Sequence, residues 1–207
     1  MNRRAFISAL GGAAVWPLTG RAQQQRNVPR IGFLGAASAS GYAAQVEGFR
    51  SGLRDLGYAE GSNIILEYRW ADGKYELLPA LAAELVRSNV DVVITHGTPA
   101  ALAAKRATTT IPIVMAIIGD PVAVGVIGAL ASPGGNITGQ SFFAPELHAK
   151  RIELIKEAMP RLARAGFLMN PDNPASGGPV LLEIQKTAQH LNVEVAEFPV
   201  RAPKRVR

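Results

Sequence analysis

The stretch VDVVITHGTPAALAAK, residues 90–105, contains the pattern that decides the fold. It begins as a run of β-branched apolar residues, typical of a buried strand, and continues as an Ala- and Leu-rich segment typical of a helix. The junction between them is His96-Gly97-Thr98-Pro99. A threonine side chain can cap the helix that follows it, and proline is favoured at the first helical position because it has no N–H to leave unpaired. Taken alone, Thr98 is therefore predicted to be a helix cap.

The same alternation of strand-like and helix-like segments continues on both sides of this stretch. Strands are expected at residues 30–36, 63–70, 90–97, 111–118 and 136–142. Helices are expected between them, at residues 41–58, 75–89, 99–108 and 121–131. A strand-helix alternation with brief connections predicts an α/β fold in which helices cover both faces of a doubly wound parallel sheet.

A second, shorter group of the same kind follows, with helices expected at residues 145–160 and 177–192 and strands at 164–171 and 193–200. The domain prediction is a first α/β lobe at 23–141, a partial second α/β lobe at 142–200, and a basic tail at 201–207. Only two strands are expected after residue 160, so the second lobe is predicted to be incomplete and the chain to be a fragment. A complete protein with a basic tail is the alternative.

Residues 1–22 have the layout of a secretory signal peptide, with a basic start, an apolar middle and small residues before a Gln run. The pair Arg3-Arg4 resembles the twin-arginine export motif, although Asn2 replaces the Ser or Thr that usually precedes it. The twin-arginine and general secretory routes both stay open, as does an amphipathic or disordered start of a cytosolic protein. Export is the favoured prediction, and it places the mature chain in the periplasm.

The composition excludes several classes of protein. The formal net charge is +6, but three basic residues lie in 1–22 and four in 201–207, which leaves −1 for the body of the chain. No stripe of Lys and Arg among aromatic residues is present, so nucleic-acid binding is not expected. The absence of cysteine removes disulfides, thiolate metal sites and Cys nucleophiles. No apolar stretch reaches the roughly 20 residues of a membrane span.

Three of the expected strands end in a small polar residue followed by proline: Thr98-Pro99, Asp120-Pro121 and Asn173-Pro174. The carboxyl ends of parallel strands lie along one rim, where doubly wound sheets bind ligands. Ser38 follows the first strand and is expected at the same rim. Hydroxyls and helix N–H groups suit a carboxylate, and the Asp120 carboxylate suits an ammonium group, so the rim fits an amino acid. For Thr98 and Asp120 simple capping is the alternative role.

Several segments recur in order in a known family. They are RRAFISALGGAAVWPLTGRAQQ, IGFLGAAS, GFRSGLRDLGYAEGSNIILEYRWADGKYELLPALAAELV, GTPAALAAKRATTTIPIVMAIIGDPV, GALASPGGNITGQS, KRIELIKEAMP and NPDNP. With them the chain resembles, over residues 1 to about 200, the substrate-binding components of ABC transporters grouped as tryptophan/tyrosine-type solute-binding proteins.

The resemblance implies a periplasmic-binding-protein-like fold whose two lobes close around a small amino-acid-like ligand, and a membrane permease as partner. It implies ligand contacts at six positions: Ser38, Gly97, Thr98, Asp120, Asn136 and Asn170. Two features depart from the family pattern. Members continue well beyond residue 207, and Gly119 stands where a hydroxyl residue is frequent before Asp-Pro.

An enzyme, a sensor domain of the same fold, and a fragment that binds nothing are the competing hypotheses. The chain contains no G-x-G-x-x-G after its first strand, no G-x-x-x-x-G-K-[ST] and no G-x-S-x-G. His96 lies at the rim but has no nucleophile or metal ligand at a suitable spacing, and His148 is expected on a solvated helix surface. The prediction is a monomeric, non-enzymatic solute-binding protein without cofactor or metal.

Overall fold

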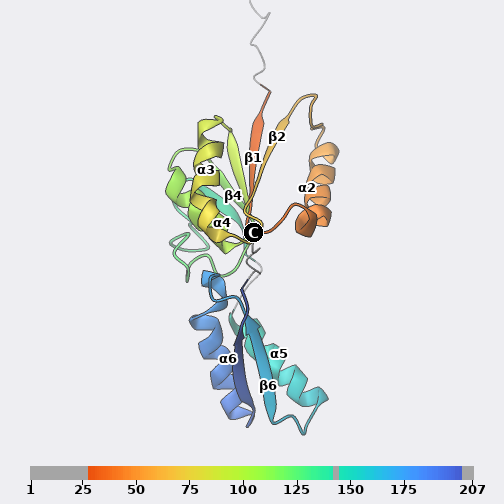
Figure 1. The fold of residues 1–207 in the computed structure, drawn as a ribbon, viewed down its shortest axis with the longest axis vertical. Coiled ribbons are helices and arrows are strands. Elements are labelled where there is room, and N and C mark those ends of the chain that lie inside the picture. Colours follow the sequence, from red (N-terminus) through yellow and green to blue (C-terminus); the bar gives the residue numbers. More distant parts are fainter. Residues whose placement is uncertain (1–27, 142–144, 202–207) are drawn as a thin grey trace, which may run out of the picture.

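The computed structural model describes residues 28–141 and 145–201 (Figure 1). The expected signal peptide at residues 1–22 and all but the first residue of the expected basic tail lie outside these ranges, so both remain predictions. Within the described ranges, no helix combines the length and the apolar character that crossing a membrane requires.

Five parallel strands form the first sheet, in the order β2-β1-β3-β4-β5. The strands are β1 (Arg30–Gly35), β2 (Ile65–Trp70), β3 (Val92–His96), β4 (Ile113–Ile118) and β5 (Ile137–Ser141). The chain moves outward from β1 to β2 and then returns to add β3 on the other side of β1. This reversal opens a crevice at the carboxyl ends of β1 and β3, where doubly wound sheets bind ligands. The predicted fold class is confirmed.

Helices cover both faces of the first sheet (Figure 1). On one face lie α3 (Leu78–Arg87) and α4 (Thr98–Ala107), and on the other lies α2 (Ala43–Asp55) after the short 3-10 helix η2 (Ser40–Tyr42). The α3 and α4 face holds the larger core, in which Leu34, Leu78, Leu85, Ile113 and Ile118 are almost completely buried. The α2 face has a smaller core around Phe33, Val46 and Ile94.

The helix predicted at residues 121–131 does not form. Turns connect β4 to β5 instead, and the N–H groups of Val126 and Ile127 both donate to the carbonyl of Pro121, at 2.8 and 3.1 Å. Gly125 has a φ of 74°, which ends any right-handed helix after one turn. Two of the apolar side chains that suggested a helix, Val126 and Ile127, are nevertheless buried in the larger core.

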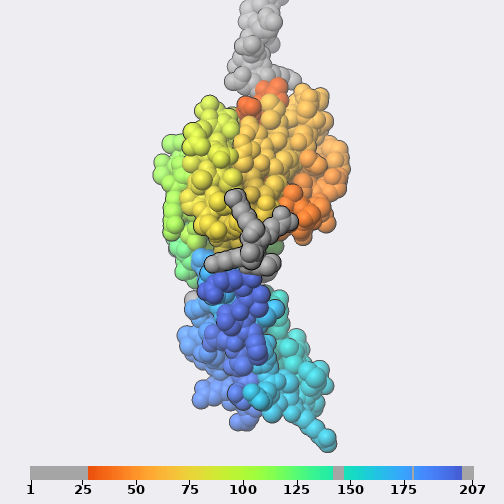
Figure 2. All heavy atoms as spheres, viewed as in Figure 1, coloured from red at the N-terminus to blue at the C-terminus, as the bar shows by residue number. Residues whose placement is uncertain are grey.

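The second lobe is built on two parallel strands, β6 (Arg164–Met169) and β7 (Glu194–Pro199). They are accompanied by α5 (Pro145–Ala158), α6 (Pro179–His190) and the 3-10 helix η4 (Pro174–Ser176), and α5 packs against α6. The buried side chains of this lobe are Val180, Ile184, Ala188 and Val193. Figure 2 shows this narrower lobe continuing below the carboxyl rim of the first lobe.

Candidate functional site

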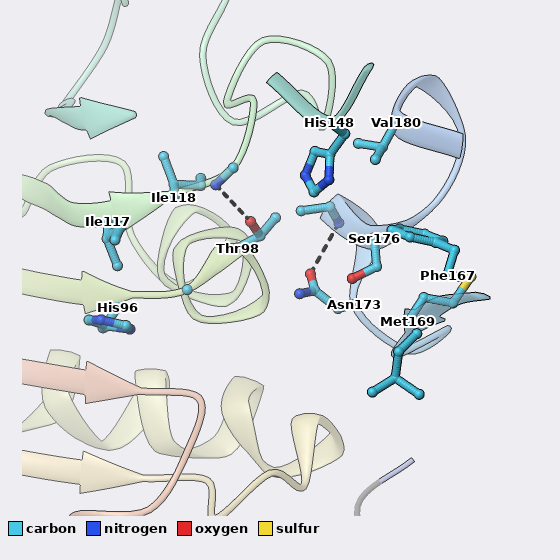
Figure 3. Close-up of a pocket in the computed structure, with 14 residues that line it drawn as sticks. His96, Thr98, Ile117, Ile118, His148, Phe167, Met169, Asn173, Ser176 and Val180 are labelled. Atoms are coloured by element: carbon cyan, nitrogen blue, oxygen red, sulfur yellow. Dashed lines mark hydrogen bonds between the residues drawn. The ribbon is translucent and has the colours of Figure 1, made fainter. Parts of the chain in front are cut away.

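A cavity of about 350 Å³ lies between the carboxyl rim of the first sheet and the second lobe (Figure 3). The first lobe contributes His96, Gly97, Thr98, Ile117, Ile118 and Gly119. The second lobe contributes His148, Phe167, Leu168, Met169, Asn173, Ala175, Ser176 and Val180. The volume lies within the usual range of small-molecule sites, roughly 300–1,000 Å³. We refer to this space as the interlobe cavity.

The turn after β3 forms the first-lobe wall. Gly97 precedes α4 with a φ of 93°, which glycine adopts without strain, and Thr98 is the first helical residue. Thr98 Oγ1 makes no cap bond to α4; it accepts a hydrogen bond from the N–H of Gly119 at 3.3 Å. The predicted cap role of Thr98 is therefore wrong. Its hydroxyl joins the turn after β3 to the turn after β4, and the side chain is only 3% exposed.

The second-lobe wall is the Pro-rich turn after β6. Asn173 Oδ1 accepts from the N–H of Ala175 at 3.1 Å and so caps η4 (Figure 3). The lobes come close here, because a Cβ built on Gly119 would lie 2.8 Å from the Cβ of Ala175. The hydroxyl residue that is frequent at position 119 in the resembling family could not occupy it in this arrangement without a shift.

The interlobe cavity contains two histidines and no Asp, Glu, Lys or Arg among its described lining residues. The His96 ring contacts the Tyr42 ring, with centroids 3.8 Å apart, and the His148 ring meets Phe167 edge-on at 6.2 Å. Burial lowers the pKa of both histidines below the ordinary value of 6.5. Both rings are therefore mostly neutral at pH 7, and the walls suit an uncharged, largely apolar part of a ligand.

Two of the six predicted contact residues, Gly97 and Thr98, line the interlobe cavity. Ser38 lies at the β1 end of the rim, where its Oγ accepts from the N–H of Gly41 at 3.2 Å. Asp120 follows Gly119, and its Oδ1 accepts from the N–H groups of Val122 and Ala123, both at 3.0 Å. Ser38 and Asp120 are thus engaged locally and do not line the cavity in this arrangement.

Asn170 connects the lobes, whereas Asn136 lies elsewhere. The side-chain amide of Asn170, in the second lobe, donates to the hydroxyl of Tyr75, in the first lobe, at 3.4 Å. Asn136 precedes β5, and its side-chain amide donates to the carbonyl of Ile111 at 2.6 Å, just before β4 begins. The expectation that Asn136 joins the rim residues is wrong: it lies at the amino ends of the strands, on the opposite edge of the sheet from the cavity.

Sequence reasoning missed most of the second-lobe wall. His148 was expected on a solvated helix surface, but it lines the interlobe cavity. Phe167 and Met169 are two residues apart on β6 and belong to its less exposed face, so strand alternation could have indicated them. Among the described residues, no group of three or more His, Cys, Asp or Glu side chains could hold a metal ion.

Comparisons with known proteins find a matching family and similar structures. A family model described as ABC transporter substrate binding protein matches residues 31–207. The chain is 34% identical over 124 residues to a tyrosine-binding protein of Clostridioides difficile (strain R20291), a match that covers 60% of this chain and 35% of that protein.

Two solved structures are similar. One is a conserved domain protein from Vibrio cholerae, with a TM-score of 0.77, 29% identity, and coverage of 84% of this chain and 57% of that one. The other is the ABC domain from Streptococcus pneumonia in complex with L-tryptophan, with a TM-score of 0.75, 28% identity, and coverage of 83% and 57%. The chain thus spans just over half the length of these structures and about a third of the curated relative.

Proposed function

Because the chain belongs to the family of ABC transporter substrate-binding proteins, we propose that it is the extracytoplasmic solute-binding component of an ABC importer. It captures a small amino-acid-like ligand between its two lobes and presents it to a membrane permease. The family is described as one of substrate-binding proteins, and one of the similar structures is a complex with L-tryptophan, which supports a non-catalytic role here. Proteins of this family are typically extracytoplasmic, which supports export through the expected signal peptide at residues 1–22.

The interlobe cavity is the observation that carries this proposal. Its walls come from both lobes, and the first-lobe wall lies at the carboxyl ends of β3 and β4, next to the switch point between β1 and β3, so a ligand there would contact both lobes at once. The cavity also adjoins the first turn of α4, and the N-terminus of a helix attracts anionic groups. A ligand carboxylate would lie at this turn beside Thr98. An apolar ligand side chain would then lie against Phe167, Met169 and Val180.

The ammonium group of such a ligand needs an anionic partner. Asp120 is the nearest candidate in sequence, since it follows the lining residue Gly119 and its carboxylate is partly exposed. Ser38 and Asn170 are proposed to join the site from the rim of β1 and from the turn after β6. In this proposal the first lobe spans residues 23–141 and the second lobe spans residues 142–200. The protein acts as a monomer and binds no nucleic acid.

Isothermal titration with L-tyrosine, L-tryptophan and L-leucine tests the proposal. We expect saturable binding of at least one of these amino acids to the chain. Ser176 lines the interlobe cavity, so Ser176→Phe should fill it and abolish binding. Ser62 is exposed in the turn before β2, so Ser62→Phe makes the same change in size away from the cavity and should leave binding unchanged. Equal binding by both variants would exclude the interlobe cavity as the site.

A further inference from the structure

A second hollow lies outside the interlobe cavity, between α2 and the edge strand β2. Its volume is about 440 Å³, which is larger than that of the interlobe cavity. Its lining residues are Ala39, Ala43, Val46, Glu47, Arg50, Tyr68 and Trp70. We call it the α2–β2 groove. None of its lining residues borders the interlobe cavity, so the proposed function leaves it without a role.

Two parallel aromatic rings form one wall of the α2–β2 groove. Tyr68 and Trp70 are two residues apart on β2 and therefore project from the same face of the sheet. Their rings are 6° from parallel, with centroids 6.1 Å apart. Trp70 is held in place by its neighbours: a Cβ on Gly35 of β1 would collide with its ring, and Tyr42 stacks on it at 5.9 Å. Position 35 therefore has to be glycine for the indole to lie against β1.

The opposite wall, α2, is mostly exposed. Of its thirteen residues only Val46 is buried, which is unusual for a helix that covers a sheet face. Two of the groove residues on this side, Ala39 and Ala43, carry only a single methyl group each. Their small size leaves more room at the groove than a larger side chain would.

The charged groups at the groove are already paired within the protein. Arg50 Nε donates to the Tyr68 hydroxyl at 3.1 Å, its guanidinium carbon lies 5.3 Å from the Tyr68 ring centroid, and its Nη2 pairs with Glu60 at 3.0 Å. Glu47 is paired with Arg54 at 2.7 Å. Arg50 lies over Tyr68 and Tyr42 stacks on Trp70, so a ligand would meet the remaining surface of the two rings, with no uncompensated charge.

From the cavity, the parallel rings and the paired charges, we infer that the α2–β2 groove is a second ligand site that takes a planar, uncharged aromatic ring stacked against Tyr68 and Trp70. Aromatic rings prefer offset-stacked or edge-to-face contacts with other rings, and they lose little freedom when a rigid wall is already built. This site is separate from the interlobe cavity, and its occupancy does not depend on the proposed transport function.

Tryptophan fluorescence tests this site directly. The chain has two tryptophans, Trp16 and Trp70, so in a Trp16→Phe background selective excitation of tryptophan reports on Trp70 alone. We expect nicotinamide, a planar uncharged aromatic amide, to quench this emission with a saturable dependence on concentration. Cyclohexanecarboxamide, which has a saturated ring of similar size, should not do so. Quenching that rises without saturation would mean random collisions and would overturn the site.

Matched variants locate the bound ring. Ala43→Leu fills the groove and should weaken nicotinamide binding by about tenfold, the equivalent of one lost stacking contact. Ala44→Leu makes the same change at the next, exposed position of α2 and should have no effect. Ser176→Phe fills the interlobe cavity and should also leave quenching intact.

Unchanged binding in Ala43→Leu, or loss of binding in Ser176→Phe, would overturn the assignment to the groove. Far-UV circular dichroism checks that each variant is folded. If Ala43→Leu does not fold, Tyr68→Leu removes one of the two rings and keeps the Trp70 reporter. It should weaken binding to a similar degree, and unchanged binding in that variant would equally overturn the assignment.

Discussion

Two buried threonines near the end of β3 should respond in opposite directions to the same substitution. Thr95 is 0% exposed and its Oγ1 has no hydrogen-bond partner among the described residues. Thr98 is 3% exposed and its Oγ1 accepts from the buried N–H of Gly119 at 3.3 Å. Valine has nearly the same shape as threonine, so replacing either residue by valine mainly removes a hydroxyl group.

The magnitudes follow from what each hydroxyl does. Burying a hydroxyl without a partner costs about 1–3 kcal/mol in proteins, so Thr95→Val should raise the free energy of unfolding by about 1 kcal/mol. Thr98→Val leaves the N–H of Gly119 unpaired, which also costs about 1–3 kcal/mol. Because 3.3 Å is long for an N–H···O bond, we expect a loss at the low end, about 1 kcal/mol. The two variants should therefore differ by about 2 kcal/mol.

Urea unfolding followed by far-UV circular dichroism measures this difference, provided that the dependence of the unfolding free energy on urea is unchanged. Thr109 is exposed, so Thr109→Val should change stability by less than about 0.5 kcal/mol and serves as the control. A destabilised Thr95→Val variant would show that the Thr95 hydroxyl has a partner. Equal losses for Thr95→Val and Thr98→Val would refute the distinction between them.

Substitutions at Asp120, Gly139 and His96 test other parts of the structure. Asp120→Ala removes the acceptor for two N–H groups and should cost about 1 kcal/mol in chemical unfolding, and it should weaken ligands with an ammonium group by roughly 1–3 kcal/mol in titration. Asp120→Asn should keep the stability of the unsubstituted protein but lose affinity for ligands with an ammonium group. If Asp120→Asn binds these ligands as tightly as the unsubstituted protein does, Asp120 is not part of the site. Gly139 has a φ of 141°, and a Cβ added there would collide with the Met115 backbone. Gly139→Ala should therefore lower the free energy of unfolding by more than about 2 kcal/mol, measured by thermal or urea unfolding. Gly48 is exposed on α2 and a Cβ there would meet no other atom, so Gly48→Ala should raise the free energy of unfolding by up to about 1 kcal/mol. Similar changes in stability for both glycine substitutions would contradict this difference. Because burial holds the pKa of His96 below 6.5, the unfolded chain binds more protons than the folded chain as the pH falls below that value, and the free energy of unfolding should decline as the pH is lowered from about 6.5. His96→Phe keeps a ring against Tyr42 and should reduce this decline, and an unchanged pH profile would rule out His96 as a source.

The first lobe was predictable because its strands and helices differ in periodicity and are separated by short turns. The failure at residues 121–131 has a specific cause. Hydrophobic spacing cannot distinguish a helix from a compact turn that buries the same valine and isoleucine side chains. The signal in this segment that argues against a helix is its pair of glycines, Gly125 and Gly128. Long, strongly periodic segments such as the one containing α4 gave no such ambiguity.

The site was less predictable than the fold. Thr98 follows from the rule that strand ends share one rim, which depends only on topology, whereas Gly97 follows from the family resemblance. Asn136 was placed by resemblance alone, and its position before β5 already puts it at the other edge of a parallel sheet. The wall from the second lobe depends on how two lobes approach each other. Contacts such as the one between Asn170 and Tyr75, 95 residues apart, leave no periodic signal in the sequence.

The close approach of Gly119 and Ala175 bears on how tightly the protein can hold a ligand. A site that needs both walls is competent only in the fraction of molecules whose lobes have met, and the observed affinity falls in proportion to that fraction. A single methyl group at position 119 would lower this fraction, because it would hold the turns after β4 and β6 apart. Ligand affinity could thus be changed through the approach of the lobes at one lining position, while the side chains of the other lining residues set ligand specificity.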